Sequence, residues 1–314
     1  MREGPSAARL DGAAAWAVHR PGGRDVALMA VAVVGISLSG PLTALVVAPV
    51  LAIAFWRNAV GAAAMLPVLL TRERSTLAGL RLRDLRSSAV AGLFLAAHFA
   101  AWLPSLNMTT VAASIALVTT TPIWTALAAR VAGVHLPAAV WWGLVLAVLG
   151  AALIAGVDVT VSLRAVAGDG LALLGAIAAG GYVLAGARAR ARLSTSAYTV
   201  VCYSVCALVL AVAALVVDVP LTGFSARDWW LIAAITFVAQ LLGHTLLNLV
   251  LSSVGPTVVS LAVLLEVPGS LIVALVLLQQ APPLLALPGM AAVVVGVALV
   301  VRASRPAMLV EPAT

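Results

Sequence analysis

The sequence contains no lysine and only two cysteines, and charged residues make up 9% of its 314 positions. All 18 basic residues are therefore arginines. Hydrophobic residues make up 63% of the chain, and the mean hydropathy is +1.15. A water-soluble fold of this length could not bury so much apolar surface, so we expect an integral membrane protein. The net charge of +7 does not indicate a nucleic-acid partner.

Several features that would define other classes of protein are also missing. Residues 1–24 contain no apolar h-region of the kind that a signal peptide needs, so we expect a cytosolic tail and not a signal peptide. No Walker A motif or soluble domain is present, which leaves an ion gradient or a substrate gradient as the energy source. Cys202 and Cys206 lie one helical turn apart, where a cross-link gains almost nothing, and two thiols are too few for structural zinc. The sequence indicates no cofactor and no metal.

Ten apolar stretches of about 20 residues are each long enough to cross about 30 Å of hydrocarbon. They fall near residues 26–46, 49–70, 88–106, 111–133, 136–157, 170–187, 195–217, 229–251, 255–278 and 284–301. The sequence therefore predicts an all-α polytopic membrane protein with ten transmembrane helices.

The second half of the chain repeats the first without a gap, because residues 107–156 align with 253–302, an offset of 146. The histidine match is the most informative, since the chain has only four histidines. The pairs are Leu95/Leu241, His98/His244, Leu103/Leu249, Ser114/Ser260, Pro122/Pro268, Pro137/Pro283, Gly143/Gly289 and Gly150/Gly296. A fixed-period repeat determines the architecture. We predict two homologous repeats, residues 25–157 and 168–302, between cytosolic tails at 1–24 and 303–314.

The arginines predict the orientation of these helices. Fifteen of the 18 fall on one side of the predicted membrane, and only Arg164 and Arg227 on the other. The positive-inside rule therefore places both termini in the cytosol of the inner (plasma) membrane. Because each repeat has five helices, an odd number, the second repeat is predicted to run inverted relative to the first, as in many secondary transporters.

Three polar residues lie inside the predicted second and third helices. Arg57 is deep in the second, where an arginine costs roughly 2.5–3.5 kcal/mol and normally faces a polar cavity or a partner. The alternative is that it snorkels to the outer headgroups. His98 and Trp102 lie four residues apart and share one helix face. The inverted repeat predicts His98 and His244 at mirrored depths, one towards each mouth of a central cavity.

Gln240, His244 and Asn248 recur at steps of four along the predicted eighth helix. Such a stripe either bonds neighbouring helices, at ~0.6–2 kcal/mol per contact, or lines a cavity. The matching histidine in the other half favours the cavity. The candidate substrate-cavity residues are Arg57, His98, Trp102, Gln240, His244 and Asn248, with Arg57 as counter-charge for an anionic substrate group.

Glu266 is the only acidic residue well inside a predicted helix, and Pro268 follows it by two residues. A proline frees backbone carbonyls beside the carboxylate, and a buried carboxyl group can exchange protons near neutral pH. Glu266 is therefore the candidate for proton coupling, and the alternative is a structural glutamate bonded across helices. Pro122 and Pro268 are candidate hinges. Asp169 is expected to cap the start of the sixth helix, with a direct substrate contact as the alternative.

With these residues, the chain resembles the EamA-type permeases of the drug/metabolite transporter superfamily over about residues 25–302. The resemblance rests on ten helices in two repeats, Arg57, the sequence GDGL at 168–171 followed by Tyr182, and Glu266 with Pro268 before the small-residue stretch GMAAVVVGVALVV. It implies a ten-helix inner-membrane permease, often an exporter of amino acids, other small metabolites or drugs, that works by alternating access.

The chain also departs from that family at three places. Many members have Gly-Glu after helices four and nine, where this chain has GV at 133–134 and QQ at 279–280. An aromatic-Gly pair common in the first helix is replaced by Ser39-Gly40. These departures bear on the substrate and on the coupling, and not on the fold.

The leading hypothesis is a secondary transporter, not an enzyme, which exports a small-molecule substrate across the lipid bilayer, with proton antiport. One alternative is a gradient-driven facilitator without proton coupling. Another is an intramembrane enzyme that uses His98, His244 and Glu266, although no HExxH or acidic-rich motif accompanies them. A third is a non-transporting membrane partner, for which the loops are too short to hold a docking domain. The sequence leaves monomer and homodimer open.

Overall fold

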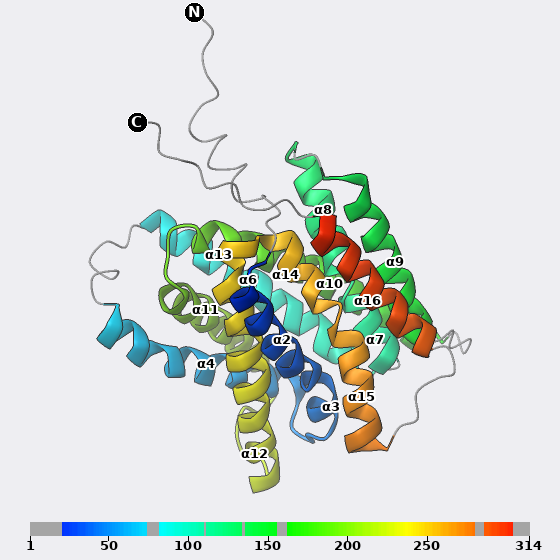
Figure 1. Ribbon diagram of the computed structural model, residues 1–314. Helices are drawn as coiled ribbons and strands as arrows, with labels where there is room; N and C mark the ends of the chain where they lie inside the picture. Colours follow the sequence, from blue (N-terminus) through cyan, green and yellow to red (C-terminus); the bar gives the residue numbers. More distant parts are fainter. Residues whose placement is uncertain are drawn as a thin grey trace, which may run out of the picture.

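The computed structural model describes residues 21–73, 82–109, 111–133, 136–155, 162–279 and 286–303. Within these ranges the chain is helical and contains no strand (Figure 1). Most of the two predicted tails, and the departure positions Val134 and Gln280, lie outside the described residues.

Each half of the chain contributes a series of long and short helices. The first half contains α2 (Gly23–Ser37), α3 (Ser39–Ala44), α4 (Val50–Arg72), α6 (Leu82–Ser105), α7 (Val111–Val118), α8 (Thr121–Val131) and α9 (Ala138–Ala155). The second contains α10 (Leu163–Arg190), α11 (Thr195–Val216), α12 (Ala226–Ile235), the π-helix η1 (Thr236–His244), α13 (Thr245–Val254), α14 (Pro256–Val263), α15 (Glu266–Leu278) and α16 (Ala286–Ala303).

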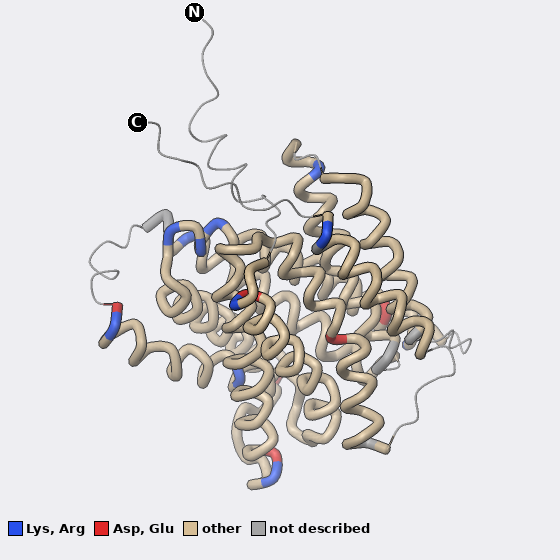
Figure 2. The backbone as a smooth tube through the Cα atoms, in the orientation of Figure 1, with Lys and Arg blue, Asp and Glu red and all other residues tan. Residues whose placement is uncertain are grey.

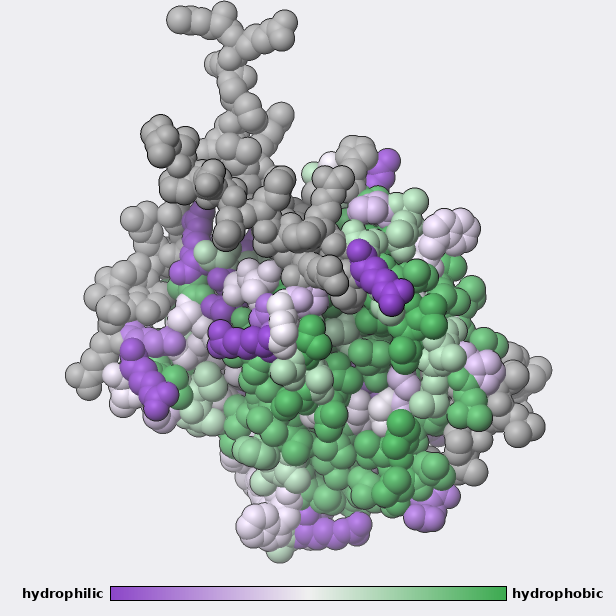
Figure 3. Space-filling view, viewed as in Figure 1, coloured by the Kyte–Doolittle hydropathy of each residue, from purple (hydrophilic) through white to green (hydrophobic). Residues whose placement is uncertain are grey.

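The outer surface of these helices is suited to lipid. Among the described residues, eight helical segments are long and apolar enough to cross a membrane, and Ala138–Leu153 and Leu287–Val300 form two shorter apolar helices. Large apolar side chains such as Trp142, Leu215 and Val276 are exposed. Hydrophobic residues cover the middle of the face in Figure 3, and hydrophilic residues gather towards its two ends. This is the surface of a multi-pass membrane protein.

Two of the expected membrane helices are broken at matched places in the two halves. The fourth is interrupted at Thr119–Thr120, between α7 and α8, and the ninth at Leu264–Leu265, between α14 and α15. The helical turn before each break is of the 3₁₀ type, because its hydrogen bond spans three residues and not four. Thr120 N–H donates to Leu117 O (3.1 Å), and Leu265 N–H donates to Ala262 O (3.1 Å). Each break is followed within the first helical turn by a proline, Pro122 or Pro268, where its missing N–H costs nothing.

The sixth helix begins earlier than expected, so the prediction that Asp169 caps it is wrong. The helix α10 starts at Leu163, because the Ser162 hydroxyl accepts the Ala165 N–H (3.1 Å) and satisfies the first turn. Asp169 lies inside the helix, and its Oδ1 is buried with no hydrogen-bond partner among the described residues.

The helices of the two halves interleave around a common centre. The helix α10 packs along α6, and α11 packs along both α4 and α6, while α9 and α16 pair beside this group (Figure 1). The approach of α10 to α6 depends on Gly175, where a Cβ atom would lie 3.0 Å from the Cβ of Trp102. The contact places Trp102, and with it His98 four residues earlier, against α10.

Candidate substrate cavity

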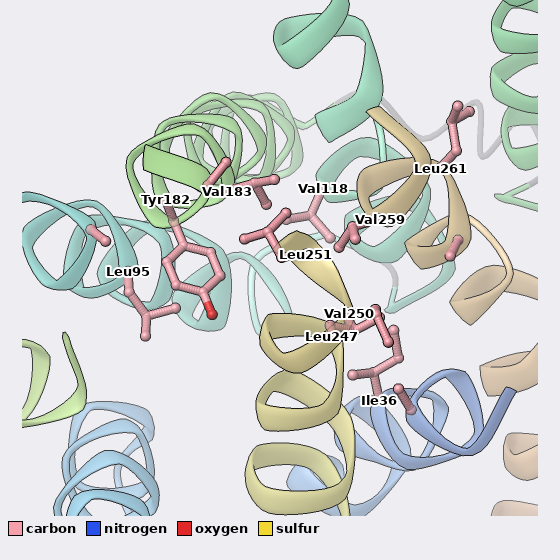
Figure 4. Packing of buried hydrophobic residues seen from close by; sticks show 14 of the residues in the cluster. Ile36, Leu95, Val118, Tyr182, Val183, Leu247, Val250, Leu251, Val259 and Leu261 are labelled. Atoms are coloured by element: carbon pink, nitrogen blue, oxygen red, sulfur yellow. The ribbon is translucent and has the colours of Figure 1, made fainter. Parts of the chain in front are cut away.

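A cavity of about 60 Å³ lies between helices of both halves. Its polar lining comes from Ser39, His98, Thr119, Thr121, His244, Asn248 and Glu266. Figure 4 shows the apolar part, with Leu95, Tyr182 and Leu251 pointing into the space between α6, α10 and α13. Typical ligand pockets measure ~300–1,000 Å³. The helices must therefore move apart before the cavity admits more than a few water molecules.

His98 is held on the cavity wall by the backbone of α10. Its Nδ1 lies 3.0 Å from the Gly175 carbonyl oxygen, and because a carbonyl only accepts, Nδ1 carries the hydrogen and Nε2 is left as an acceptor when the ring is neutral. The ring stacks on Trp102 with centroids 5.5 Å apart. Trp102 also lines the cavity, so the face predicted for these two residues is the one that faces the cavity.

His244 lies on the same cavity from the other half of the chain. Its ring is edge-on to Phe99 (6.1 Å) and Tyr182 (6.4 Å), and His98 lies 5.0 Å from the same Phe99 ring. The two histidines were expected towards opposite mouths of a cavity. Both flank a single phenylalanine on one cavity, and their relative depths in the membrane stay a prediction.

Arg57 lies behind the cavity and not on its lining. The side chain is 0% exposed, which does not fit snorkelling to the headgroups. Its Nε donates to Gln240 Oε1 (3.0 Å), its Nη1 donates to Ser39 Oγ (3.2 Å), and its Cζ lies 4.6 Å from the centre of the Phe99 ring. The last contact is a cation–π interaction. Of its two hydrogen-bond partners among the described residues, Ser39 lines the cavity and Gln240 does not.

The polar stripe of the eighth helix is divided by the π-helix. Gln240 turns to Arg57 and donates to Asn58 Oδ1 (3.1 Å), whereas His244 and Asn248 line the cavity. In η1 a backbone N–H bonds to the carbonyl five residues earlier, as Thr245 N–H does to Gln240 O. Residues four positions apart therefore no longer lie on one face of the helix. The predicted cavity set therefore separates into Arg57 and Gln240 behind the wall and His98, Trp102, His244 and Asn248 on it.

Several hydroxyl and amide groups at the site were not singled out from the sequence. Tyr182 was named only as a landmark, and its hydroxyl donates to Asn248 Oδ1 (2.8 Å). Asn248 Nδ2 lies 3.4 Å from the Tyr203 hydroxyl. Asn58 directly follows Arg57 within an apolar helix, and this position could have marked it as a candidate site residue. Ser39 was named only as part of the Ser39-Gly40 departure from the family, and nothing in the sequence indicated its contact with Arg57.

Glu266 is the first residue of α15 and lines the cavity with 7% of its surface exposed. The N-terminus of a helix presents free backbone N–H groups and favours negative charge. The corresponding break in the first half carries Thr119 and Thr121 on the cavity lining. The two candidate hinges, Pro122 and Pro268, both lie in the first turn of the helix after a break.

No metal centre is formed within the described part of the chain, where no three His, Cys, Asp or Glu side chains come together. Cys202 and Cys206 are free and buried.

Comparison with known proteins places this arrangement in a family. No curated protein matches the sequence. A solved structure described only as "Crystal structure of protein" shares the fold, with a TM-score of 0.70 and 19% identity over 90% of this chain and 97% of that chain. At this identity the likeness shows the fold alone. Residues 24–156 and 166–302 each match the EamA-like transporter family, one match per repeat. This multi-pass membrane protein therefore belongs to the EamA-like transporter family.

Proposed function

We propose that the protein is a secondary transporter of the inner (plasma) membrane that exports a small metabolite, such as an amino acid, or a drug. Transport proceeds by alternating access, and Glu266 exchanges a proton for the substrate. The observation that carries this proposal is the position of Glu266, an acidic side chain on a cavity enclosed by both halves of the chain, at the start of a half-helix. Secondary transporters build their sites from such discontinuous helices.

The proposed architecture is ten helices in two inverted repeats, with α9 and α16 as the fifth and tenth. The matched helix breaks at Thr119–Thr120 and Leu264–Leu265 support a common plan for the two halves. Most described basic residues lie towards the upper side of Figure 2, where α8 and α16 end. This distribution supports a cytosolic location for that side, and for both termini.

Alternating access requires the cavity to open to one side at a time. Pro122 and Pro268 lie in the first turns of α8 and α15, next to the interruptions at Thr119–Thr120 and Leu264–Leu265, and a proline has no N–H with which to continue the helical hydrogen bonds across them. We place the flexible points of the two repeats at these breaks. The rocking of one repeat against the other then exposes Glu266 to each side of the membrane in turn.

The proposal is tested by proton movement in everted membrane vesicles. Wild type and Glu266→Gln are challenged with amino acids, related metabolites and cationic drugs, and Asp169→Asn serves as the matched control because Asp169 is acidic, in a helix and not on the cavity lining. We expect a substrate-dependent collapse of the pH gradient in wild type and in Asp169→Asn, and none in Glu266→Gln. Substrate equilibration without proton movement in wild type would instead identify a facilitator.

A further inference from the structure

The hydroxyl of Ser39 has an unusual set of hydrogen bonds for a helix serine. Ser37 donates its hydroxyl hydrogen to Val33 O, four residues back (2.7 Å), and Thr119 donates to Ile115 O (2.8 Å) in the same way. Ser39 instead follows the interruption at Leu38 and is the first residue of α3. Its oxygen accepts from Arg57 Nη1 (3.2 Å). A hydroxyl has one hydrogen to donate, and Ser39 donates its hydrogen to no group among the described residues.

The charge behind this hydroxyl has no carboxylate among its hydrogen-bond partners in the described part of the chain. Arg57 donates to the neutral oxygens of Gln240 and Ser39, and its Nη2 is buried without a hydrogen-bond partner among the described residues. A cation that is buried beside neutral partners attracts negative charge strongly. The side chain does not line the cavity, and Ser39 is the lining residue to which it donates a hydrogen bond.

We propose that Ser39 is a substrate-binding residue, whose hydroxyl, polarised by Arg57, donates a hydrogen bond to a carboxylate or carbonyl oxygen of the transported compound. Arg57 is then a positioning residue that strengthens the Ser39 donor and does not touch the substrate. Hydrogen bonds that involve an ionised group are about twice as strong as neutral ones, and a donor chain polarises along its length. This inference rests on the transport function proposed above, and it names the chemical group that the cavity selects.

Thr119 provides the matched comparison for this role. It lines the same cavity and is the same kind of donor, but its hydrogen is used by the backbone of its own helix. Thr119→Val therefore makes the lining less polar but removes no free hydrogen-bond donor. Ser39→Ala removes the free donor, and Ser39→Thr retains it.

The test uses reconstituted full-length protein and three matched sets of probes built on alanine, leucine and phenylalanine. Each set contains the free amino acid, its amide and the amine that lacks the carboxyl carbon. Counterflow uptake gives KM and the maximal rate for each probe in wild type, Ser39→Ala, Ser39→Thr and Thr119→Val. We expect Ser39→Ala to raise KM for the acid and the amide by roughly 10-fold, the usual effect of losing a hydrogen bond to a charged or strong acceptor. KM for the amine stays unchanged.

The comparison within each set distinguishes a binding role from a structural one. Equal losses for acid, amide and amine in Ser39→Ala would overturn the inference, as would the same selective loss in Thr119→Val. A larger effect on the acid than on the amide identifies a carboxylate as the preferred group, and equal effects identify any acceptor oxygen. Rescue by Ser39→Thr is expected.

A separate binding readout keeps this inference distinct from the transport proposal. Thermal stabilisation of the solubilised protein by the same probes is measured in parallel. Stabilisation by the acids that is lost in Ser39→Ala, without any flux in wild type, would retain the role of Ser39 and overturn the transport function. If neither flux nor stabilisation occurs with any acid or amide in wild type, the inference is overturned. Should Ser39→Ala fail to fold, Ser39→Cys takes its place, because the thiol keeps the volume but is a weak donor.

Discussion

Gly143 of α9 and Gly296 of α16 touch so closely that a Cβ atom on Gly143 would lie 2.6 Å from the Gly296 carbonyl oxygen. One further contact mirrors this one, because a Cβ on Gly150 would lie 2.6 Å from Gly289 O. The sequence repeat matches Gly143 with Gly289 and Gly150 with Gly296. The repeat therefore relates the contact between Gly143 and Gly296 to the contact between Gly150 and Gly289. A two-fold axis between α9 and α16 produces this relation.

The two glycine contacts predict that a side chain added at any of these glycines lowers the stability of the protein. Gly143→Ala forces the two backbones apart, and overpacking of this kind costs about 1–3 kcal/mol. Thermal unfolding in detergent is expected at a lower temperature than for wild type. Gly170→Ala is the control, since nothing lies within 4 Å of its Cβ position in α10, and alanine at an open helical position stabilises by ~0.4–1 kcal/mol. Equal unfolding temperatures for the two variants would contradict the close contact.

Gln240 gives a second prediction, because it joins two buried polar groups that have few alternatives. Its amide accepts from Arg57 Nε and donates to Asn58 Oδ1. Gln240→Leu leaves both without that partner, at about 1–3 kcal/mol for each unsatisfied group and more for the charged one. We expect a lower free energy of unfolding and loss of transport together.

The matched variant for this test is Gln240→Glu. It keeps an acceptor for Arg57 and adds a negative charge beside the buried cation, whose hydrogen-bond partners are neutral, so it should unfold at a clearly higher temperature than Gln240→Leu. In thermal unfolding, wild type and Gln240→Glu should therefore both unfold at a higher temperature than Gln240→Leu. A leucine variant as stable as the glutamate variant would show that the network contributes nothing.

The general plan of this molecule could be predicted from the sequence because the relevant signals are long or repeated. Hydropathy identifies the membrane helices, and the 146-residue offset relates the two halves and their prolines. The prolines that follow the two helix breaks, Pro122 and Pro268, were named as hinges because the repeat matches them. The family membership followed from the same features.

The details of the site could not be predicted, because they depend on backbone geometry that no short pattern specifies. The π-helix η1 shifts Gln240 away from His244 and Asn248, although a regular helix would keep all three on one face. The start of α10 depends on one hydroxyl, that of Ser162. The role of Ser39 depends on which neighbour its oxygen meets, and this is a tertiary contact with Arg57.

Arg190 joins the end of α10 to α13, and this contact carries the third prediction. Arg190 donates from Nε to Asn248 O (2.9 Å) and from Nη2 to Ser252 Oγ (3.2 Å), and it also contacts Leu193 O. Asn248 lines the cavity with its side chain. The bond from Arg190 therefore fixes the backbone of a cavity residue to the end of the neighbouring helix.

Arg190→Ala should loosen α13 without disturbing the rest of the fold. We expect faster hydrogen–deuterium exchange in peptides that cover Thr245–Val254, and a change in substrate KM because Asn248 loses its backbone support. Arg190→Lys should give an exchange rate between those of wild type and Arg190→Ala, since an ammonium group cannot reproduce the forked donor geometry of a guanidinium. Arg130→Ala is the control, because Arg130 lies in the last turn of α8 and is exposed. Exchange in α13 that rises equally in Arg130→Ala would mean that loss of positive charge, and not the bond to Asn248, loosens the helix.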